Sequence, residues 1–226
     1  FCCAVPGAWH VMGVTQGAGL SLKWFRDNFC QAEKDTAAGM GVDPYVLMDQ
    51  EAGQSPIGCN RLLYLPYLMG ERTPHLDPDC RGVFFGLSAM HTKRDLLRAV
   101  MEGVTYSQRD SVEILRGMGV ELREMLACGG GGTSPLWRQM LADTYNCPVK
   151  TVKSKEGPAL GVAILAGVGV GLYPSVQEAC KAMIQLNPAQ EPIPENVPQY
   201  EAFYQVYKSL YPALKENYKL LAATGA

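Results

Sequence analysis

The stretch LACGGGGTSPLWRQMLAD, residues 126–143, sets four consecutive glycines between an apolar segment and a helical pattern. Leu126 to Cys128 are typical of the end of a buried strand. Gly129–Gly132 carry no Cβ, so their backbone can take positive φ and another group can approach it closely. Ser134 followed by Pro135 indicates a helix start, since the serine caps free N–H groups and proline fits the first helical position. We therefore expect a strand, a glycine turn and a helix N-terminus.

This arrangement has two interpretations. Unpaired N–H groups and the positive end of the helix dipole favour an anion such as a phosphate. A glycine turn also serves simply to reverse the chain in many α/β proteins, and on this stretch alone that interpretation is slightly favoured. The stretch is not a Walker loop, because it lacks the Gly-Lys-Ser/Thr ending, and the Gly-x-Gly-x-x-Gly pattern fails after Gly132. A nucleotide at this site would require a different fold.

The composition is that of a globular chain. The 226 residues suit one domain or one and a half, with 47% apolar and 19% charged residues. A net charge of −2 gives no electrostatic reason to expect nucleic acid as a partner. No apolar run reaches the ~18 residues that span a membrane. We therefore expect neither a nucleic-acid nor a membrane partner.

The cysteines and histidines do not form a metal-binding pattern. The eight cysteines include no Cys-x-x-Cys pair, and the three histidines are far apart. Cys128, Cys147 and Cys180 have apolar neighbours, which is typical of reduced core residues in a cytoplasmic protein. The chain begins at Phe1 without a signal-peptide pattern, and we interpret that start as a truncation.

The remaining elements are predicted from periodicity and from turn residues. Strands or extended runs are expected over 9–15, 61–68 and 147–152, and loops over 34–44, 70–82 and 188–198. Helices are expected over 17–29, 44–51, 92–117, 157–167 and 175–186, and from 199 onward. Thr92 with Asp95 three positions on predicts a capping box at the start of the 92–117 helix. In the 157–167 helix, small residues would let a helix and a sheet approach closely. The terminal helix has an apolar stripe typical of core or interface packing: Tyr200, Phe203, Tyr207, Leu210, Leu214, Tyr218 and Leu221.

Several stretches together resemble one family. GVFFGLSAMHTKRDLLRAVME, 82–102, has the spacing of the second signature of the FGGY family of carbohydrate kinases, with matches at Gly82, Phe84, Gly86, Leu87, Asp95, Leu96, Ala99 and Glu102. Residues 129–143 are similar to the family's nucleotide loop, and ALGVAILAG, 159–167, to its small-residue helix. GERTPH, 70–75, and LYPALK, 210–215, resemble the xylulokinase branch in particular.

The resemblance implies an α/β fold: an actin-like ATPase domain of ribonuclease H type, with a mixed sheet flanked by helices. Residues 1–226 would be the carboxy-terminal, ATP-side domain without its first strands, and the amino-terminal sugar-binding domain is absent from this chain. In the family, two such domains close on a cleft. A carboxylate near their junction takes the proton of the sugar hydroxyl as it attacks the γ-phosphate, with Mg²⁺ bridging the phosphates.

The resemblance also assigns nucleotide contacts. It places Gly130, Gly131 and Ser134 against adenosine, although Ser134 could only cap its helix. Gly19 matches a glycine near the ADP phosphates, and Lys23 matches a position whose side chain varies, so a solvated helix lysine is about as good an interpretation. The family's catalytic Asp is expected upstream of residue 1, and the acids present here, Asp27, Asp77, Asp79 and Asp143, are interpreted as surface, loop and helix acids. We therefore assign no catalytic residue and no metal ligand, and we expect this chain alone to be inactive.

The expected function is that of the ATP-binding part of a sugar kinase that phosphorylates a pentulose, with D-xylulose favoured. A ribulose, glycerol or gluconate kinase of the same family is the alternative within the class. A non-catalytic actin-like module that senses ATP without turning over a sugar is the alternative outside it. The expected partners are the amino-terminal domain, the sugar and a second copy of the protein paired through the terminal helix. The expected location is the cytoplasm.

Overall fold

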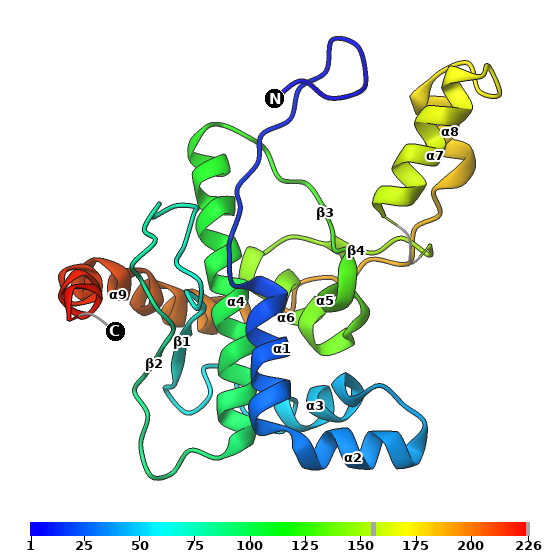
Figure 1. The fold of residues 1–226 in the computed structure, drawn as a ribbon. Coiled ribbons are helices and arrows are strands. Elements are labelled where there is room, and N and C mark those ends of the chain that lie inside the picture. Colours follow the sequence, from blue (N-terminus) through cyan, green and yellow to red (C-terminus); the bar gives the residue numbers. More distant parts are fainter. Residues whose placement is uncertain (155–156, 225–226) are drawn as a thin grey trace.

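The fold is built around one long helix. A computed structural model describes residues 1–154 and 157–224. Helix α4, Lys93–Gly117, begins at the predicted capping box of Thr92 and Asp95. Around it pack α1 (Ala18–Phe29), α3 (Pro44–Ala52), α6 (Pro135–Tyr145), α9 (Val197–Ala223) and the first strand (Figure 1). The hydrophobic core therefore lies along α4.

The strands form two pairs of opposite sense. β1 (Leu63–Leu65) is antiparallel to β2 (Val83–Phe85), and β3 (Met125–Leu126) is parallel to β4 (Val149–Lys150). β1 is buried, and Gly103 lets α4 approach it, because a Cβ at that position would overlap the carbonyl oxygen of Tyr64. The predicted mixture of parallel and antiparallel strands is present, but as two separate pairs.

The predicted strand over 9–15 is not a strand. Its backbone makes one isolated bridge, between Trp9 and Cys2, and Val14 accepts a hydrogen bond from the N–H of Thr73 at 2.9 Å. The run has the apolar residues of a strand, but a strand also needs a neighbour that takes its N–H and C=O groups. Within the described part of the chain, no strand lies beside it.

A helix replaces part of the predicted loop over 34–44. Helix α2, Gln31–Met40, ends at Gly41 in the left-handed conformation, with φ 68°. Its Ala, Glu, Lys and Gln residues are good helix formers and outweigh the single glycine inside it, Gly39. Gly41 is therefore a helix end, not part of a longer loop.

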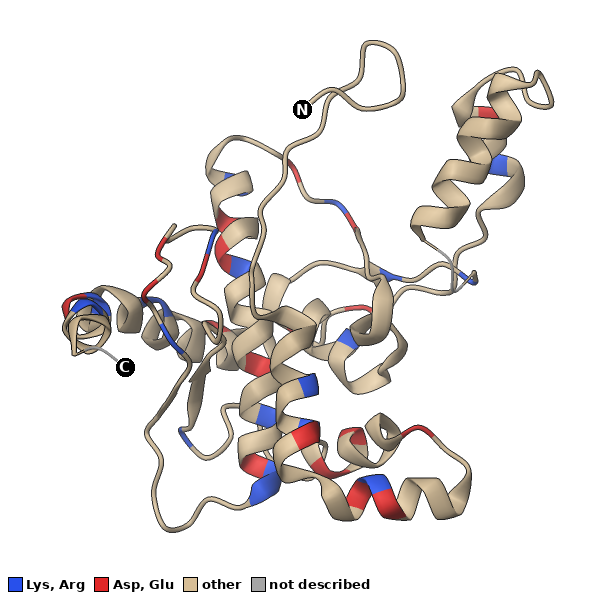
Figure 2. Ribbon diagram, viewed as in Figure 1, with Lys and Arg blue, Asp and Glu red and all other residues tan. Residues whose placement is uncertain are grey.

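Two helices stand away from the rest. Helix α7, Pro158–Gly169, packs on α8, Val176–Met183, and the hairpin projects from the body of the molecule (Figure 1). Figure 2 shows a single acidic–basic pair on this hairpin, which is Glu178 and Lys181. Only Ile164 of α7 is buried, and Val162 is 67% exposed. The close approach of α7 to a sheet, expected from its small residues, is not seen within the described residues.

Most of the predicted apolar stripe on the terminal helix, α9, packs into the hydrophobic core. The side chains that it buries against the body are Tyr200, Tyr204, Tyr207, Leu210, Tyr211 and Tyr218. Of the predicted stripe, Leu221 is instead exposed. Because most of the stripe is covered by this chain itself, its length is no longer an argument for a partner. No helix in the described residues is both long and apolar enough to cross a membrane.

Candidate nucleotide-binding site

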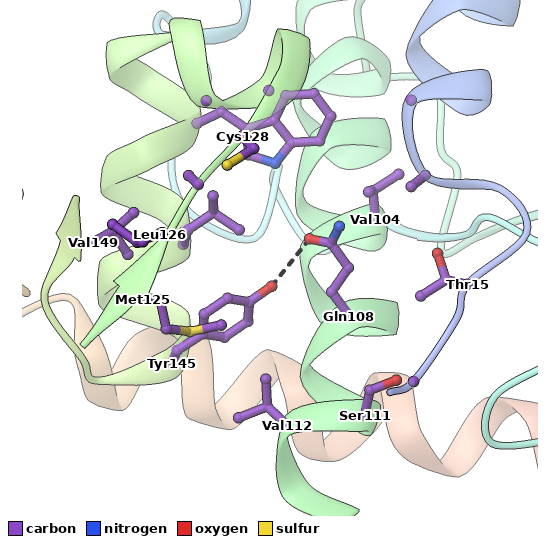
Figure 3. A pocket seen from close by; sticks show the side chains of 18 of the residues that line it. Thr15, Val104, Gln108, Ser111, Val112, Met125, Leu126, Cys128, Tyr145 and Val149 are labelled. Carbon is purple, nitrogen blue, oxygen red and sulfur yellow. Dashed lines mark hydrogen bonds between the residues drawn. The ribbon is translucent and has the colours of Figure 1, made fainter. Parts of the chain in front are cut away.

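A cavity of about 590 Å³ lies between the segment leading into α1, one face of α4 and the β3–glycine stretch (Figure 3). Its walls are mostly apolar, with Val104, Val112 and Leu126 among them. None of the described residues that line it carries a charge. Concave, largely apolar cavities of this size with a few polar groups are the usual form of small-molecule sites.

The four glycines do not form an open turn. Residues Gly129–Thr133 make a short helix, α5, between β3 and α6. Of the four glycines, only Gly129 has a positive φ, at 73°. The predicted strand–turn–helix therefore contains a helical turn, which directs the glycine backbone toward the cavity.

Gly130 faces open space, Gly131 lies against an aromatic ring, and Gly132 is required by packing. Gly130 and Gly131 line the cavity. A Cβ at Gly130 would meet nothing within 4 Å, and one at Gly131 would lie 3.4 Å from the ring of Trp137. At Gly132 a Cβ would lie only 2.8 Å from the carbonyl oxygen of Ala127. Packing explains Gly132, but it does not explain why Gly130 and Gly131 lack side chains.

Ser134 caps α6 as predicted. Its Oγ accepts a hydrogen bond from the N–H of Trp137 at 3.0 Å, and Pro135 occupies the first helical turn. The Trp137 ring lines the cavity and is held by a bond from its Nε1 to Thr105 Oγ1 at 2.9 Å. Ser134 itself is buried and is not among the lining residues. Its contact with a nucleotide remains a prediction.

Of the two predicted contacts on α1, Gly19 borders the cavity and Lys23, one turn further along the helix, does not. Gly19, in the first turn, lines the same cavity as Gly130 and Gly131. No side chain caps this helix N-terminus, so its N–H groups stay available to an anion. Lys23 is outside the lining residues: its side chain is 60% exposed, and its Nζ lies 2.7 Å from Asp27 Oδ2. The solvated-lysine interpretation therefore fits its surroundings.

Several polar side chains of the cavity have no signature in the sequence. Tyr145 Oη donates to Gln108 Oε1 at 3.1 Å, the dashed line in Figure 3. Burial raises the pKa of Tyr145, so it stays a neutral donor. Thr15 Oγ1 and Ser111 Oγ are buried atoms without a hydrogen-bond partner in the described chain. Buried polar atoms are normally paired, so these two hydroxyls are available to hydrogen-bond a ligand or a water molecule in the cavity.

The described residues do not fit a Mg²⁺ site. Residues 1–154 and 157–224 contain no cluster of three or more His, Cys, Asp or Glu placed to hold a metal ion. Asp143, expected to be an ordinary helix acid, is buried and accepts bonds from the N–H of Ile193 at 2.7 Å and from Asn196 at 2.8 Å. It anchors the connector before α9 and is not free to act on a ligand.

The chain is similar to known sugar kinases. Residues 3–170 match the model of the FGGY family of carbohydrate kinases, C-terminal domain. A xylulose kinase of Staphylococcus epidermidis is 41% identical over 94% of this chain and 41% of its own length, and a gluconokinase of Bacillus subtilis is 33% identical over 98% and 44%. The solved structure of a ligand-bound xylulose kinase from Lactobacillus acidophilus has a TM-score of 0.79 at 28% identity, covering 92% of this chain and 40% of that one. This chain thus spans about two fifths of the length of these relatives.

Proposed function

This chain belongs to the FGGY family of carbohydrate kinases, and we propose that it is the ATP-binding part of a kinase that transfers the γ-phosphate of ATP to a hydroxyl of a pentulose, D-xylulose. One observation carries the proposal: Gly19, Gly130 and Gly131 border one uncharged cavity although packing does not require the last two to be glycine. Bare backbone is what a closely bound adenosine needs.

The lining of the cavity suits one part of ATP better than the other. An uncharged, partly aromatic cavity suits the adenine and ribose, whereas the phosphates need donors and positive potential. The N-terminus of α1, which has no side-chain cap and whose Gly19 borders the cavity, offers both. We place the phosphates there.

The groups that do the chemistry come from elsewhere in this proposal. Phosphoryl transfer to a hydroxyl needs a general base and charge stabilisation of the γ-phosphate. The described cavity lining offers no carboxylate and no cation. The base, the Mg²⁺ ligands and the sugar contacts would therefore be supplied by the rest of the whole protein, which includes the amino-terminal domain. This chain alone would be inactive.

The choice of sugar rests on similarity to the relatives named xylulose kinases, of which several match more closely than the gluconokinases do. An ADP-release assay of the full-length protein on xylulose, ribulose, glycerol and gluconate tests it. We expect the highest kcat/KM with D-xylulose. A higher kcat/KM with glycerol or ribulose would contradict D-xylulose as the substrate. ATP binding without turnover of any sugar would favour the non-catalytic ATP-sensing module.

We also propose a cytoplasmic homodimer. The support for pairing is local: Leu220 and Leu221, at the end of α9, are 66% and 61% exposed. Adjacent exposed leucines at a helix end are suited to an interface. Light scattering of the full-length protein at micromolar concentration should report a dimer, and the double change Leu220→Glu and Leu221→Glu should give a monomer. A wild-type monomer would contradict the proposal.

A further inference from the structure

The chain that leads into α1 is held by a loop distant in the sequence. The N–H of Val14 donates to Thr73 Oγ1 at 3.1 Å, and the carbonyl oxygen of Val14 accepts from the N–H of Thr73 at 2.9 Å. Two residues further on, the N–H of Gln16 donates to Glu71 Oε1 at 2.9 Å. The approach to the α1 N-terminus, where we place the phosphates of ATP, is therefore fastened to loop 70–82 at two alternate residues.

Glu71 is a buried carboxylate that joins three parts of the molecule. It is 4% exposed, and its Oε1 accepts hydrogen bonds from the N–H groups of Gln16 and Arg72, at 2.9 and 2.6 Å. Its Oε2 accepts a hydrogen bond from Ser107 Oγ of α4 at 3.3 Å. Burial raises the pKa of Glu71, and these three hydrogen bonds oppose the rise. Because a buried carboxylate without donors is costly, the three bonds fix Glu71 and the Gln16 N–H relative to each other.

Loop 70–82 gives this carboxylate a fixed support. Glu71 and Asp77 exchange both backbone hydrogen bonds, at 2.9 and 2.8 Å, which closes the loop on itself. The Asp77 carboxylate accepts a hydrogen bond from Tyr211 Oη of α9 at 2.8 Å, which anchors the loop to the core. The first residues of the loop are the stretch GERTPH, singled out in the sequence, and Glu71 connects that stretch to the start of α1.

Close packing fixes the start of α1 on a second side. A Cβ at Gly17, the residue before the helix, would lie 1.7 Å from the carbonyl oxygen of Pro66, so the backbone rests directly on that residue. The carbonyl oxygen of Gly17 accepts hydrogen bonds from the N–H and the Oγ of Ser21, at 2.9 and 2.5 Å. The helix N–H groups at this end have no side-chain cap. Their directions, on which the binding of an anion depends, are therefore set by Pro66 and by loop 70–82.

We propose that Glu71 is a positioning residue for phosphoryl transfer: by holding the N–H of Gln16, it sets the direction in which the α1 N-terminus meets the phosphates of ATP. Glu71 is not among the described residues that line the nucleotide cavity, so it acts through the backbone and does not touch the nucleotide. The inference rests on the proposed function, because it takes the phosphates to lie at this helix end. Loss of the Glu71 carboxylate then weakens the binding of the phosphates and spares that of adenosine.

Calorimetric titration of the full-length protein with ADP and with adenosine tests the proposal. Glu71→Ala removes the acceptor for the Gln16 N–H. We expect its Kd for ADP to rise about tenfold or more, the effect of losing a hydrogen bond to a charged group, and its Kd for adenosine to change less than about twofold. Thr73→Val removes only the acceptor for the Val14 N–H and is the milder variant. It should also weaken ADP binding more than adenosine binding.

Two further variants separate positioning from stability. Glu71→Gln keeps an oxygen that accepts from Gln16 and removes the negative charge, so it should bind ADP at least as tightly as the wild type. Asp143→Ala is the matched control, because Asp143 is also buried, also accepts three hydrogen bonds and lies outside the cavity. We expect Asp143→Ala to lower the melting temperature as Glu71→Ala does and to leave both Kd values unchanged.

Hydrogen exchange of the Gln16 amide is measured in the same proteins without nucleotide, so it tests the contact independently of the proposed function. The amide should exchange much faster in Glu71→Ala than in the wild type or in Glu71→Gln. Unchanged exchange in Glu71→Ala would overturn the positioning role. So would equal losses of ADP and adenosine affinity in the Glu71→Ala and Thr73→Val variants, or Glu71→Gln protein that binds ADP as weakly as Glu71→Ala. A wild type whose Gln16 amide is protected but which binds neither adenosine nor ADP would instead contradict the proposed function, and the positioning role with it.

Discussion

Gly130 presents bare backbone to the proposed nucleotide cavity at a point where a side chain would meet no other atom within 4 Å. Gly130→Val in the full-length enzyme should therefore leave the fold intact and occupy the space that we propose for adenosine. We expect the KM for ATP to rise more than tenfold, which is about 1.4 kcal/mol or more of lost binding. The KM for the sugar should change much less. Steady-state kinetics with each substrate varied in turn measure both constants.

Gly39→Val is the control for this substitution. Gly39 is also a helical glycine with open space around it, but it lies on α2, outside the cavity. Its variant should show the same melting temperature as Gly130→Val and a wild-type KM for ATP. An unchanged ATP KM in folded Gly130→Val protein would mean that the glycines only turn the chain.

Asp110 should make stability depend on pH. Burial is the main reason that its pKa rises from 3.8 to about 6, against the smaller opposing effect of the Tyr204 hydrogen bond. A carboxyl whose pKa is higher in the folded state stabilises the fold below its unfolded pKa, and this stabilisation is lost as the pH rises from about 4 to about 6. The loss is about 3 kcal/mol, at 1.36 kcal/mol per pKa unit.

Asp110→Asn removes this titration. We expect the variant to melt at a higher temperature than the wild type at pH 7.5, and the difference to shrink as the pH falls to 4.5. Melting curves of the full-length protein across this range measure it. A difference that does not change with pH would contradict the shifted pKa.

At the scale of elements, the motif over 82–102 acts as a packing device. Asp95 accepts hydrogen bonds from two side chains of segment 55–61, and Glu102 accepts from a backbone N–H of the same segment. Gly86 leaves room for one of the segment's carbonyl groups. Four consecutive residues there, 58–61, have positive φ, which side chains rarely adopt. The motif residues therefore hold a strained turn in place.

Glu102→Ala tests this role. The change leaves Arg98, which is buried and bonded to Glu102 at 2.7 Å, without its counter-ion. Removing one partner of a buried pair costs about 3–5 kcal/mol, so the melting temperature should fall by several degrees while the ATP KM of the folded enzyme stays the same. Glu216→Ala breaks an exposed pair on α9 and should change almost nothing. An equal fall in melting temperature in the two variants would contradict the role of Glu102 in holding the turn.

At the scale of the whole molecule, two strand edges and one apolar helix surface are left without a neighbour among the described residues. The segment 9–15 has no neighbouring strand among the described residues, β3 pairs on one side only, and α7 exposes its apolar side chains. Unpaired strand edges and large exposed apolar surfaces are normally covered in a native protein. We propose that strands from the rest of the whole protein pair with these edges and cover α7.

Hydrogen exchange of the full-length protein tests this proposed strand pairing. We expect the amides of residues 11–15 to exchange as slowly as those of α4, because backbone hydrogen bonds in a paired strand protect them. The exposed end of α9 serves as a fast-exchanging reference in the same data. Exchange of residues 11–15 as fast as that reference would show that the segment stays unpaired.

Features that depend on neighbouring residues could be predicted from the sequence. The capping box of Thr92 and Asp95 and the start of α6 at Ser134 and Pro135 were predicted correctly, because a cap involves residues within one turn. The spacing of the motif over 82–102 was enough to identify the family. The strand over 9–15 was wrong for the opposite reason, since strand pairing depends on residues that are distant or outside the chain.

The cavity itself was decided by the tertiary structure. Gly19 and Gly130 are more than a hundred positions apart, and only the tertiary packing brings them to the same cavity. The same packing turns Lys23 outward and joins Tyr145 to Gln108. Sequence alone determined where α4 and α6 begin, because a helix cap is local, but it did not predict α2 and α5. Which helix faces meet was decided by the burial of apolar side chains against one another, which local patterns do not specify.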